Sequence, residues 1–467
     1  MFARRSRWSV VGTLSGVVAV TAVMSLSAQA PKKPASAAPR PAAQAPAAAK
    51  PAAAPAKVQQ VVKPPIAQAW IDVATLSGFG MPNMGEMMKG EGGAMGAAMG
   101  SLFGGGKKDQ NSNEFLRTQQ MMEGRWLDVT LRTSNNPNLA EATQAVPQGL
   151  GLAPSLKLQT PPKAEPVKDD EEPGEFHYER PKGKLYLYWG CGAEVREGQP
   201  KVLDIATATP QELGQFFQAR RATQRGAHVA AGRPVWPSRE DRRLVPASGS
   251  LVGEHAFAGQ GVPESFKFAI PAMQDFMPEI ALKQEEQGGA HVLSWQPLEQ
   301  ARAYFISAMG AKGMGGGGDE VEMVLWTSSE LPDSGFGLMD YQTNPAVDKW
   351  LAEKVLLPPQ TDTCTVPKGI FGEQGTGMLR MIAYGNELNL VDPPRPADPK
   401  IAWEPVWSLK VRVKSVSSAM LGVDMSELRG RKGSKSTSTG EEAPTATRPE
   451  EKPKKKGLRG LLGGIKP

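Results

Sequence analysis

Two stretches of the sequence, AWIDVAT at residues 69–75 and RWLDVTL at residues 125–131, repeat one pattern and point to the fold class. Each places a tryptophan, a branched apolar residue, an aspartate and a valine in the same order. Alternation of apolar and polar residues with a period of two is typical of a strand that buries one face. We therefore predict that the two stretches are partner strands of one sheet.

Similar alternation recurs along the chain and predicts a mainly β protein, built from two or three β-sandwich-like modules with a few short helices. The other predicted strands are GLAPSLKLQTPP (151–162), GKLYLYW (183–189), KVLDIA (201–206), ESFKFAIP (264–271), PEIALKQ (278–284), VEMVLWTSS (321–329), GMLRMIAYGNELNL (377–390) and WSLKVRVKSV (407–416). An acidic, proline-rich stretch, KAEPVKDDEEPGE, marks a loop or a boundary between the first two modules.

Two helices are predicted among these strands. The first begins at a capping box of Thr209 and Glu212, with Pro210 in the first helical position. The second, at residues 344–356, is predicted with Asn344 as its cap. Its predicted apolar face consists of Val347, Trp350, Leu351 and Val355.

The chain divides into seven predicted segments. They are a signal peptide or membrane anchor (1–30), a linker rich in alanine, proline and lysine (31–65), an N-terminal β module (66–160) with a glycine- and methionine-rich insert (78–106), an acidic, proline-rich linker (161–183), a central β module (184–290), a third β module (291–425) and a basic tail (426–467). We predict that the linker 31–65 and the tail are disordered, because they contain too little apolar surface to fold.

Residues 1–30 carry the features of an export signal. Arg4, Arg5 and Arg7 precede an uncharged run over residues 8–28, which ends in a small-x-small pattern. Pro31 follows this pattern and disfavours cleavage, so an uncleaved signal that tethers the chain to the inner membrane is an alternative. In both cases the predicted location is the periplasm or cell envelope.

The net charge of +6 conceals segments of opposite sign. Residues 1–30, 31–65 and 426–467 carry +3, +6 and +6, which leaves −9 on residues 66–425. Because the part of the chain that can fold is acidic, we exclude nucleic acid as the main partner. We expect the basic arms to contact an envelope protein or an anionic envelope surface, either lipid or polysaccharide.

The basic tail contains a candidate docking segment. Apolar side chains recur there at helical spacing beside basic ones, as in helices that lie on anionic membranes or in the groove of a partner. The residues are Lys454, Lys455, Lys456, Leu458, Leu461, Leu462 and Ile465. An inert tail is the alternative, because four glycines weaken such a helix.

The segment HVLSWQPLEQARAYFIS (291–307) predicts two strands, with Trp295 on the first and Tyr304 on the second. This pair resembles the central strands of fibronectin type III-like sandwiches, in which a tryptophan packs near a tyrosine of the next strand. The resemblance implies a β-sandwich over residues 291–425, although the helix at 344–356 departs from the pattern. The whole chain is also similar to a family of uncharacterised exported proteins of Gram-negative bacteria, which implies the compartment and no activity.

Cys191 and Cys364 are the only cysteines of the chain. An oxidising compartment and an even number favour a disulfide between them. Two buried thiols, or a reactive Cys191, are the alternatives.

The sequence offers two further candidate sites. The stretch WTSSELPDSGFGLMDY (326–341) gathers the polar residues Ser328, Ser329, Glu330, Asp333, Asp340 and Tyr341. Two of its carboxylates could act as acid and base in glycoside cleavage if they stood about 5–10 Å apart, whereas turn residues and caps are the alternative.

The insert 78–106 holds candidate Cu(I) ligands, because thioethers select soft ions. These are Met81, Met84, Met87, Met88, Met95 and Met99.

The alternative interpretations of the insert are a disordered loop and an association element with small residues at every fourth position.

The four histidines are too widely separated to form a recognisable zinc motif, and we expect no catalytic residue and no cofactor. The sequence therefore favours a non-catalytic, exported protein of the cell envelope with a binding or structural role. The alternatives are an envelope hydrolase that acts on glycans through the loop at 327–341 and a periplasmic copper-binding protein.

Overall fold

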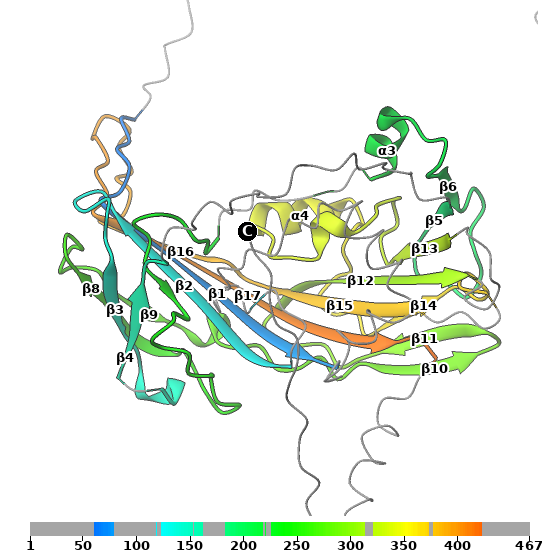
Figure 1. Cartoon of the computed structure of the whole chain (residues 1–467), viewed down its shortest axis with the longest axis horizontal. Helices are drawn as coiled ribbons and strands as arrows, with labels where there is room; N and C mark the ends of the chain where they lie inside the picture. The colour runs from blue at the N-terminus through cyan, green and yellow to red at the C-terminus, as the bar shows by residue number, and fades with distance from the viewer. Residues whose placement is uncertain are drawn as a thin grey trace, which may run out of the picture. The chain divides into compact units, whose positions relative to one another are not determined.

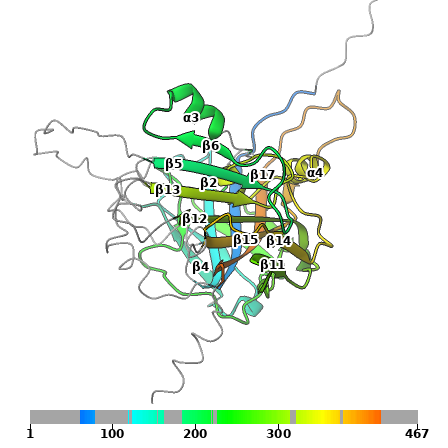
Figure 2. The same ribbon diagram turned by 90° about the vertical axis from the view of Figure 1, so that its right-hand side faces the viewer.

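The computed structural model describes residues 60–78, 118, 123–152, 154–161, 183–217, 220, 226–312, 321–372 and 377–422. These residues form a sheet of 14 strands, a sheet of three strands and two short α-helices (Figures 1 and 2). The mainly β fold class predicted from the sequence is thus confirmed.

The large sheet passes through all three predicted modules. In spatial order it consists of β6 (Lys201–Asp204), β5 (Gly183–Trp189), β13 (Val321–Thr327), β12 (Ala301–Lys312), β15 (Gly377–Gly385), β17 (Trp407–Met420), β1 (Ala67–Ser77), β2 (Gly124–Thr133), β7 (Val235–Trp236), β4 (Ser155–Gln159), β3 (Glu141–Ala145), β8 (Gly253–Gly259) and β9 (Lys267–Ile270), while β16 (Leu388–Asp392) pairs with β17 outside this path. Its parallel pairs, β1 with β17 and β5 with β13, both join strands from different predicted modules.

The remaining elements pack on the large sheet. The small sheet consists of β10 (Lys283–Gln287), β11 (Ala290–Ser294) and β14 (Thr363–Val366). The α-helices are α3 (Pro210–Phe216) and α4 (Asn344–Ala352), and single 3₁₀ turns are η2 (Gln148–Leu150), η3 (Ala272–Gln274) and η4 (Phe336–Leu338). Figure 1 shows α4 above the ribbon of β12 and β15, and β10 and β11 below it.

The two echoing stretches of sequence lie in β1 and β2, at the centre of the large sheet. The strands are antiparallel, and their register places Asp72 directly opposite Asp128. On its other side β1 runs parallel to β17, with Asp72 opposite Arg412. The prediction that the two stretches are partner strands is confirmed.

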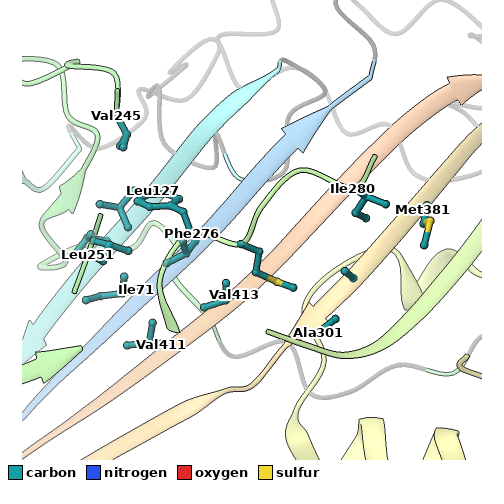
Figure 3. Close-up of a cluster of buried hydrophobic side chains, with 14 of the residues drawn as sticks. Ile71, Leu127, Val245, Leu251, Phe276, Ile280, Ala301, Met381, Val411 and Val413 are labelled. Atoms are coloured by element: carbon teal, nitrogen blue, oxygen red, sulfur yellow. The ribbon is translucent and has the colours of Figure 1, made fainter. Parts of the chain in front are cut away.

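One face of the central strands is apolar. Ile71 of β1 and Val411 of β17 point to this face and belong to one buried cluster with Phe276, from the segment between β9 and β10 (Figure 3). Leu293 of the small sheet joins the same cluster. Full burial of a side chain of this size contributes roughly 1.5–3 kcal/mol, so this face supplies a large part of the driving force for folding.

The opposite face of the sheet is covered in part by α4. Val347 and Trp350 of the helix share a buried cluster with Phe305 of β12 and Tyr384 of β15. The helix thus buries the apolar side predicted from its spacing. Because β-strand side chains alternate between faces, the same strands can hold an apolar core below and a different environment above.

Both helices are short, and only α3 has a side-chain hydrogen bond at its N-cap. At α3 the predicted capping box is confirmed, since the Thr209 hydroxyl accepts from the N–H of Glu212 at 3.2 Å and the Glu212 carboxylate accepts from the N–H of Thr209 at 2.8 Å. At α4 the predicted cap is wrong by one residue, because Thr343 occupies the cap position. The Asn344 side chain instead binds backbone groups of Glu387, at 2.9 and 3.0 Å.

Two predicted boundaries also differ from the structure. α4 ends at Ala352 rather than at residue 356, and Lys354 has a positive φ of 58°, which stops the helix. Residues 278–282 lie outside any strand, and only Lys283 and Gln284 of the predicted strand enter β10. The apolar residues there reflect burial of Ile280, which is 3% exposed. Ile280 is buried in the core without pairing to a neighbouring strand.

Cys191 and Cys364 form a disulfide, as predicted, with their Cα atoms 5.2 Å apart. Cys191 follows β5 of the large sheet, and Cys364 lies in β14 of the small sheet. The bond therefore ties the two sheets together across 173 residues of sequence. It excludes the alternatives of two free thiols and of a reactive Cys191.

Trp295 and Tyr304 pack against each other, with ring centroids 5.6 Å apart in an edge-to-face arrangement. The Tyr304 hydroxyl accepts a hydrogen bond from the N–H of Leu298 at 2.7 Å. The pair connects the end of β11 to β12, and hence the small sheet to the large one. The wider resemblance to a fibronectin type III-like module stays a prediction.

Candidate functional site

β17 carries three basic side chains on the face of the sheet that α4 covers. Lys410, Arg412 and Lys414 alternate with apolar residues that point to the other face. The exposed fractions of these side chains fall along the strand from 25% to 8% and then 1%. The three basic side chains thus become progressively more buried from Lys410 to Lys414.

Each of these basic groups has a carboxylate partner. Lys410 Nζ lies 2.7 Å from Glu387 Oε1, Arg412 Nη2 lies 2.6 Å from Asp72 Oδ2, and Lys414 Nζ lies 2.9 Å from Asp340 Oδ1. The guanidinium of Arg412 also donates from Nε to Asp72 Oδ1 at 2.6 Å, which makes that pair bidentate. Charges buried in this way are stable only when they are paired, because desolvation is costly.

The pKa values of the inner pairs reflect burial and partner charge. Burial lowers the pKa of Lys414, and the charge of Asp340 offsets this only in part. Burial alone would raise the pKa of Asp340, but Lys414, the charge of Arg412 and a backbone hydrogen bond from Tyr341 together lower that pKa. For Arg412, burial lowers the pKa and the adjacent Asp72 carboxylate more than compensates, so its pKa is raised.

Tyr341 lies beneath two of these cations. The centroid of its ring is 4.4 Å from Arg412 Cζ and 4.2 Å from Lys414 Nζ, within the range of cation–π contacts. Its hydroxyl donates to the Val73 carbonyl oxygen at 2.8 Å, and burial raises its pKa well above the ordinary tyrosine value. The Tyr341 ring is therefore held in place and uncharged beside the ion pairs of Arg412 and Lys414.

A polar pocket of about 790 Å³ lies at the Lys410 end of this face. It is lined by β1, β2, β17, residues around 228–233 and the start of α4. Its charged and aromatic lining residues are Trp70, Arg132, His228, Arg233, Tyr341, Glu387, Lys410 and Arg412. We refer to it as the arginine pocket.

Trp70 lines the arginine pocket, and the side chains of two arginines lie near its ring. Arg233 Cζ lies 5.0 Å and Arg132 Cζ 5.9 Å from the centroid of the Trp70 ring. Arg233 Nη1 donates to His228 Nε2 at 2.7 Å, and His228 Nδ1 contacts the Gly226 carbonyl oxygen at 2.8 Å. Both bonds form together when His228 is neutral with its proton on Nδ1, so the imidazole helps to orient Arg233.

The two arginines carry uncompensated positive charge. Arg132 donates to the side-chain oxygen of Gln68, its neighbour across β1 and β2, and among the described residues neither Arg132 nor Arg233 has a carboxylate partner. Burial first, and then the positive charge of Arg132, lower the pKa of Arg233. Two guanidinium groups held close together without a counter-charge make a site that favours an anion.

The start of α4 adds to this polarity. Thr343 lines the arginine pocket and is the N-cap residue, and its side chain makes no capping hydrogen bond. The amino-terminal end of a helix carries partial positive charge from its unpaired N–H groups. The neutral groups of Gln68 and Thr343 provide hydrogen-bonding capacity beside the charges.

The structure distributes the predicted polar loop over several local interactions. Ser328 Oγ accepts from the N–H of Ile306 at 2.9 Å, and Ser329 Oγ accepts from the N–H of Leu331 at 3.0 Å. Both serines are buried. Their hydroxyls thus satisfy backbone groups where β13 ends.

The carboxylates of that loop have basic partners from different parts of the chain. Glu330 pairs with Arg196, whose hydrogen bond is the main cause of the lowered pKa of Glu330. Asp333 Oδ2 lies 2.9 Å from Nη1 of Arg220. A general acid in glycoside cleavage needs a raised pKa, and the pKa values of Glu330 and Asp340 are both lowered. Of the six predicted residues, Tyr341 lines the arginine pocket and Asp340 supports the ion pair beside it.

Two predicted sites lie outside the described residues. They are the methionine set of the insert (Met81, Met84, Met87, Met88, Met95 and Met99) and the docking set of the tail (Lys454, Lys455, Lys456, Leu458, Leu461, Leu462 and Ile465). Within the described ranges, no group of three or more histidine, cysteine, aspartate or glutamate side chains is arranged to hold a metal ion. In the same ranges no helix has the length and apolar character needed to span a bilayer.

The arginine pocket was not predicted from the sequence, although several signals for it exist. The alternation K-R-K in WSLKVRVKSV places three bases on one face of a strand, and the residues between them, Val411 and Val413, are apolar. Asp72, within the repeated W-x-D-V pattern, is the partner that such a strand needs. Arg233 comes from an arginine-rich connector of irregular structure, and no periodicity indicates where it lies.

Comparisons with known proteins identify no similar protein. No family model, no curated protein and no solved structure matches the chain.

Proposed function

We propose that the protein is a non-catalytic, exported binding protein of the cell envelope, and that the arginine pocket holds an acidic saccharide. The observation that carries the proposal is the pair Arg132 and Arg233, which flank Trp70 without a carboxylate partner among the described residues. The export and the envelope location rest on the sequence of residues 1–30. The binding role rests on the pocket.

The size and the chemistry of the pocket support this class of ligand. Small-molecule sites span about 300–1,000 Å³, so about 790 Å³ accommodates two or three sugar units. A guanidinium fork matches the geometry of a carboxylate. The amide of Gln68 and the hydroxyl of Thr343 line the same space and can bind sugar hydroxyls.

The test is calorimetric titration of the full chain with trigalacturonate and with its carboxyl-reduced, neutral counterpart. We expect the acidic trisaccharide to bind more tightly, with an affinity that falls as salt is added, because partly exposed charges are screened. Arg132→Met and Arg233→Met should each weaken binding about 10-fold or more, since a hydrogen bond to a charged group contributes about 1.5–3 kcal/mol.

Lys201→Met is the matched control, because it removes one positive charge from an exposed residue of β6, at the edge of the sheet, whereas the pocket lies at the central strands. It should leave the affinity unchanged. Equal binding of the acidic and neutral trisaccharides, or equal binding by Arg132→Met, Arg233→Met and wild type, would refute the proposal.

The other functions that the sequence raised receive no support from the described residues. The carboxylates of the polar loop have lowered pKa values or structural partners, and the methionine insert lies outside the described ranges. The glycan hydrolase and the copper-binding protein stay predictions.

A further inference from the structure

A second cavity, of about 120 Å³, lies on the same face of the sheet between β12, β13, β15 and the segment 334–339. Its walls are mainly apolar. The apolar side chains that line it include Met309, Leu325, Phe336, Met339 and Met378. A benzene molecule occupies an apolar cavity of about 150 Å³ in another protein, so this space suits a single ring or a short branched chain.

The segment that closes the cavity is held in a fixed conformation. Gly335 has a φ of +80°, and a Cβ at this position would lie 3.0 Å from Cζ of Phe305. Glycine therefore fits here where other residues would be strained. Asp333 Oδ1 accepts from the N–H of Gly335 at 2.7 Å, which fixes the turn that places Ser334 and Phe336 at the cavity.

Arg380 brings a charge to this apolar space. It lies in β15 directly opposite Ser307 of β12 and Ser418 of β17, and it lines the cavity with both. Among the described residues its side chain makes no hydrogen bond or ion pair, and its Nε atom is buried without a partner. The hydroxyl of Ser334 is also buried without a partner.

Nearby charges do not neutralise Arg380. Burial lowers the pKa of Arg380, and the charge of the Asp340 carboxylate opposes this shift only in part. That carboxylate is already hydrogen-bonded to Lys414. Among the described residues, no carboxylate lines the cavity.

We propose that this cavity binds a small carboxylate with an apolar body of about the size of a benzene ring. The carboxylate would accept hydrogen bonds from Arg380 and Ser334, and the apolar body would pack among the methionines. A carboxylate pairs well with a guanidinium, and here it would give the buried Nε of Arg380 the partner that this atom lacks among the described residues. This proposal does not rest on saccharide binding, because the arginine pocket is lined by a different set of residues.

The experiment measures binding of benzoate and of benzyl alcohol, its neutral counterpart of similar size, to the full chain by calorimetry at neutral pH. Wild type should prefer benzoate. Arg380→Met should weaken benzoate binding about 10- to 100-fold and leave benzyl alcohol nearly unaffected, because it removes the charge and keeps an apolar side chain. Ser307→Leu should abolish binding of both probes by filling the cavity.

Two further variants separate the outcomes. The double variant Arg132→Met/Arg233→Met should bind benzoate as wild type does, and loss of binding there would assign the probe to the arginine pocket and overturn the proposal. If Arg380→Met does not fold, Ser334→Ala serves in its place, with an expected loss of about 3- to 10-fold. Benzoate binding that is insensitive to Arg380→Met or to Ser307→Leu, or absent in wild type, would also overturn it.

Discussion

The two faces of the central sheet differ in whether they bury charged side chains. Ile71 and Asp72 are neighbours in β1 and are 0% and 1% exposed, yet they point to opposite faces. The face of Ile71 is an apolar core, whereas the face of Asp72 holds ion pairs, the arginine pocket and the second cavity. The apolar face requires only good packing, but the charged face requires a partner for every charge.

Because buried charges on this face need partners, the arginines that have no carboxylate partner are candidates for binding an external anion. The three basic residues of β17 each have a carboxylate within 2.9 Å, so pairing is the rule on this face. Arg132, Arg233 and Arg380 depart from the rule, and each lines a cavity. Arg132 is exposed, whereas Arg233 and Arg380 are half-buried, and a half-buried cation without a carboxylate partner beside a cavity favours an anion in that cavity.

The largest expected change in stability comes from a substitution that removes one partner of a buried ion pair on the charged face. Asp72→Asn leaves Arg412 buried, at 8% side-chain exposure, without a counter-charge. Removal of one partner from such a pair typically costs about 3–5 kcal/mol, so we expect a decrease of that size in the free energy of unfolding, measured by urea denaturation.

The double variant Asp72→Asn/Arg412→Met is its control, because it removes the orphaned charge together with its partner. It should recover much of the lost stability, since replacement of a buried ion pair by groups of similar volume is often neutral. If the single and double variants were equally unstable, the pairing rule for this face would be wrong.

A smaller effect is expected on the apolar face. Ile71→Val removes one methylene from the cluster drawn in Figure 3 and should lower the free energy of unfolding by about 0.5–1.5 kcal/mol in the same urea experiment. Binding of trigalacturonate should not change, because Ile71 points away from the arginine pocket. A large loss of affinity in this variant would show that the two faces are not independent.

The difference between the faces also explains what the sequence could predict. Strand alternation and the W-x-D-V repeat depend on local periodicity, and they correctly predicted β1, β2, β17 and the β class. The pairing of β1 with β17 joins residues more than 300 positions apart, such as Asp72 and Arg412. No local pattern specifies that contact, so the continuous sheet could not be derived from the periodicity of its strands.

The candidate site was less predictable for a related reason. Alternating Lys410, Arg412 and Lys414 have the pattern of an exposed strand face, and the structure places Lys414 at 1% exposure. Burial of these charges depends on carboxylates brought from distant segments, such as Asp340 before α4. The disulfide was predictable because two cysteines allow one pairing, whereas seven arginines in the connector at 220–243 allow no such deduction.

The smallest expected effect concerns pH on the apolar side of the sheet. His255 of β8 is 2% exposed, stacks on Phe268 at 5.2 Å, and bonds to the Leu251 carbonyl oxygen at 2.8 Å. Burial lowers the pKa of His255 below its ordinary value of 6.5. The unfolded chain therefore binds more protons than the folded one as the pH falls through about 6.5, and stability must decrease in that direction.

The charged face should respond in a different range of pH. The lowered pKa of Asp340 contributes stability that is present above its ordinary value of 3.8 and is lost as the pH falls below it. His255→Gln should therefore flatten the decline in the free energy of unfolding between about pH 7 and pH 5, measured by urea denaturation at each pH, and should leave the decline below about pH 4 in place. His291→Gln is the matched histidine control and should retain the wild-type profile. An unchanged slope between pH 7 and pH 5 in His255→Gln would assign that decline to other groups, and the apolar face would then have no titrating residue of its own.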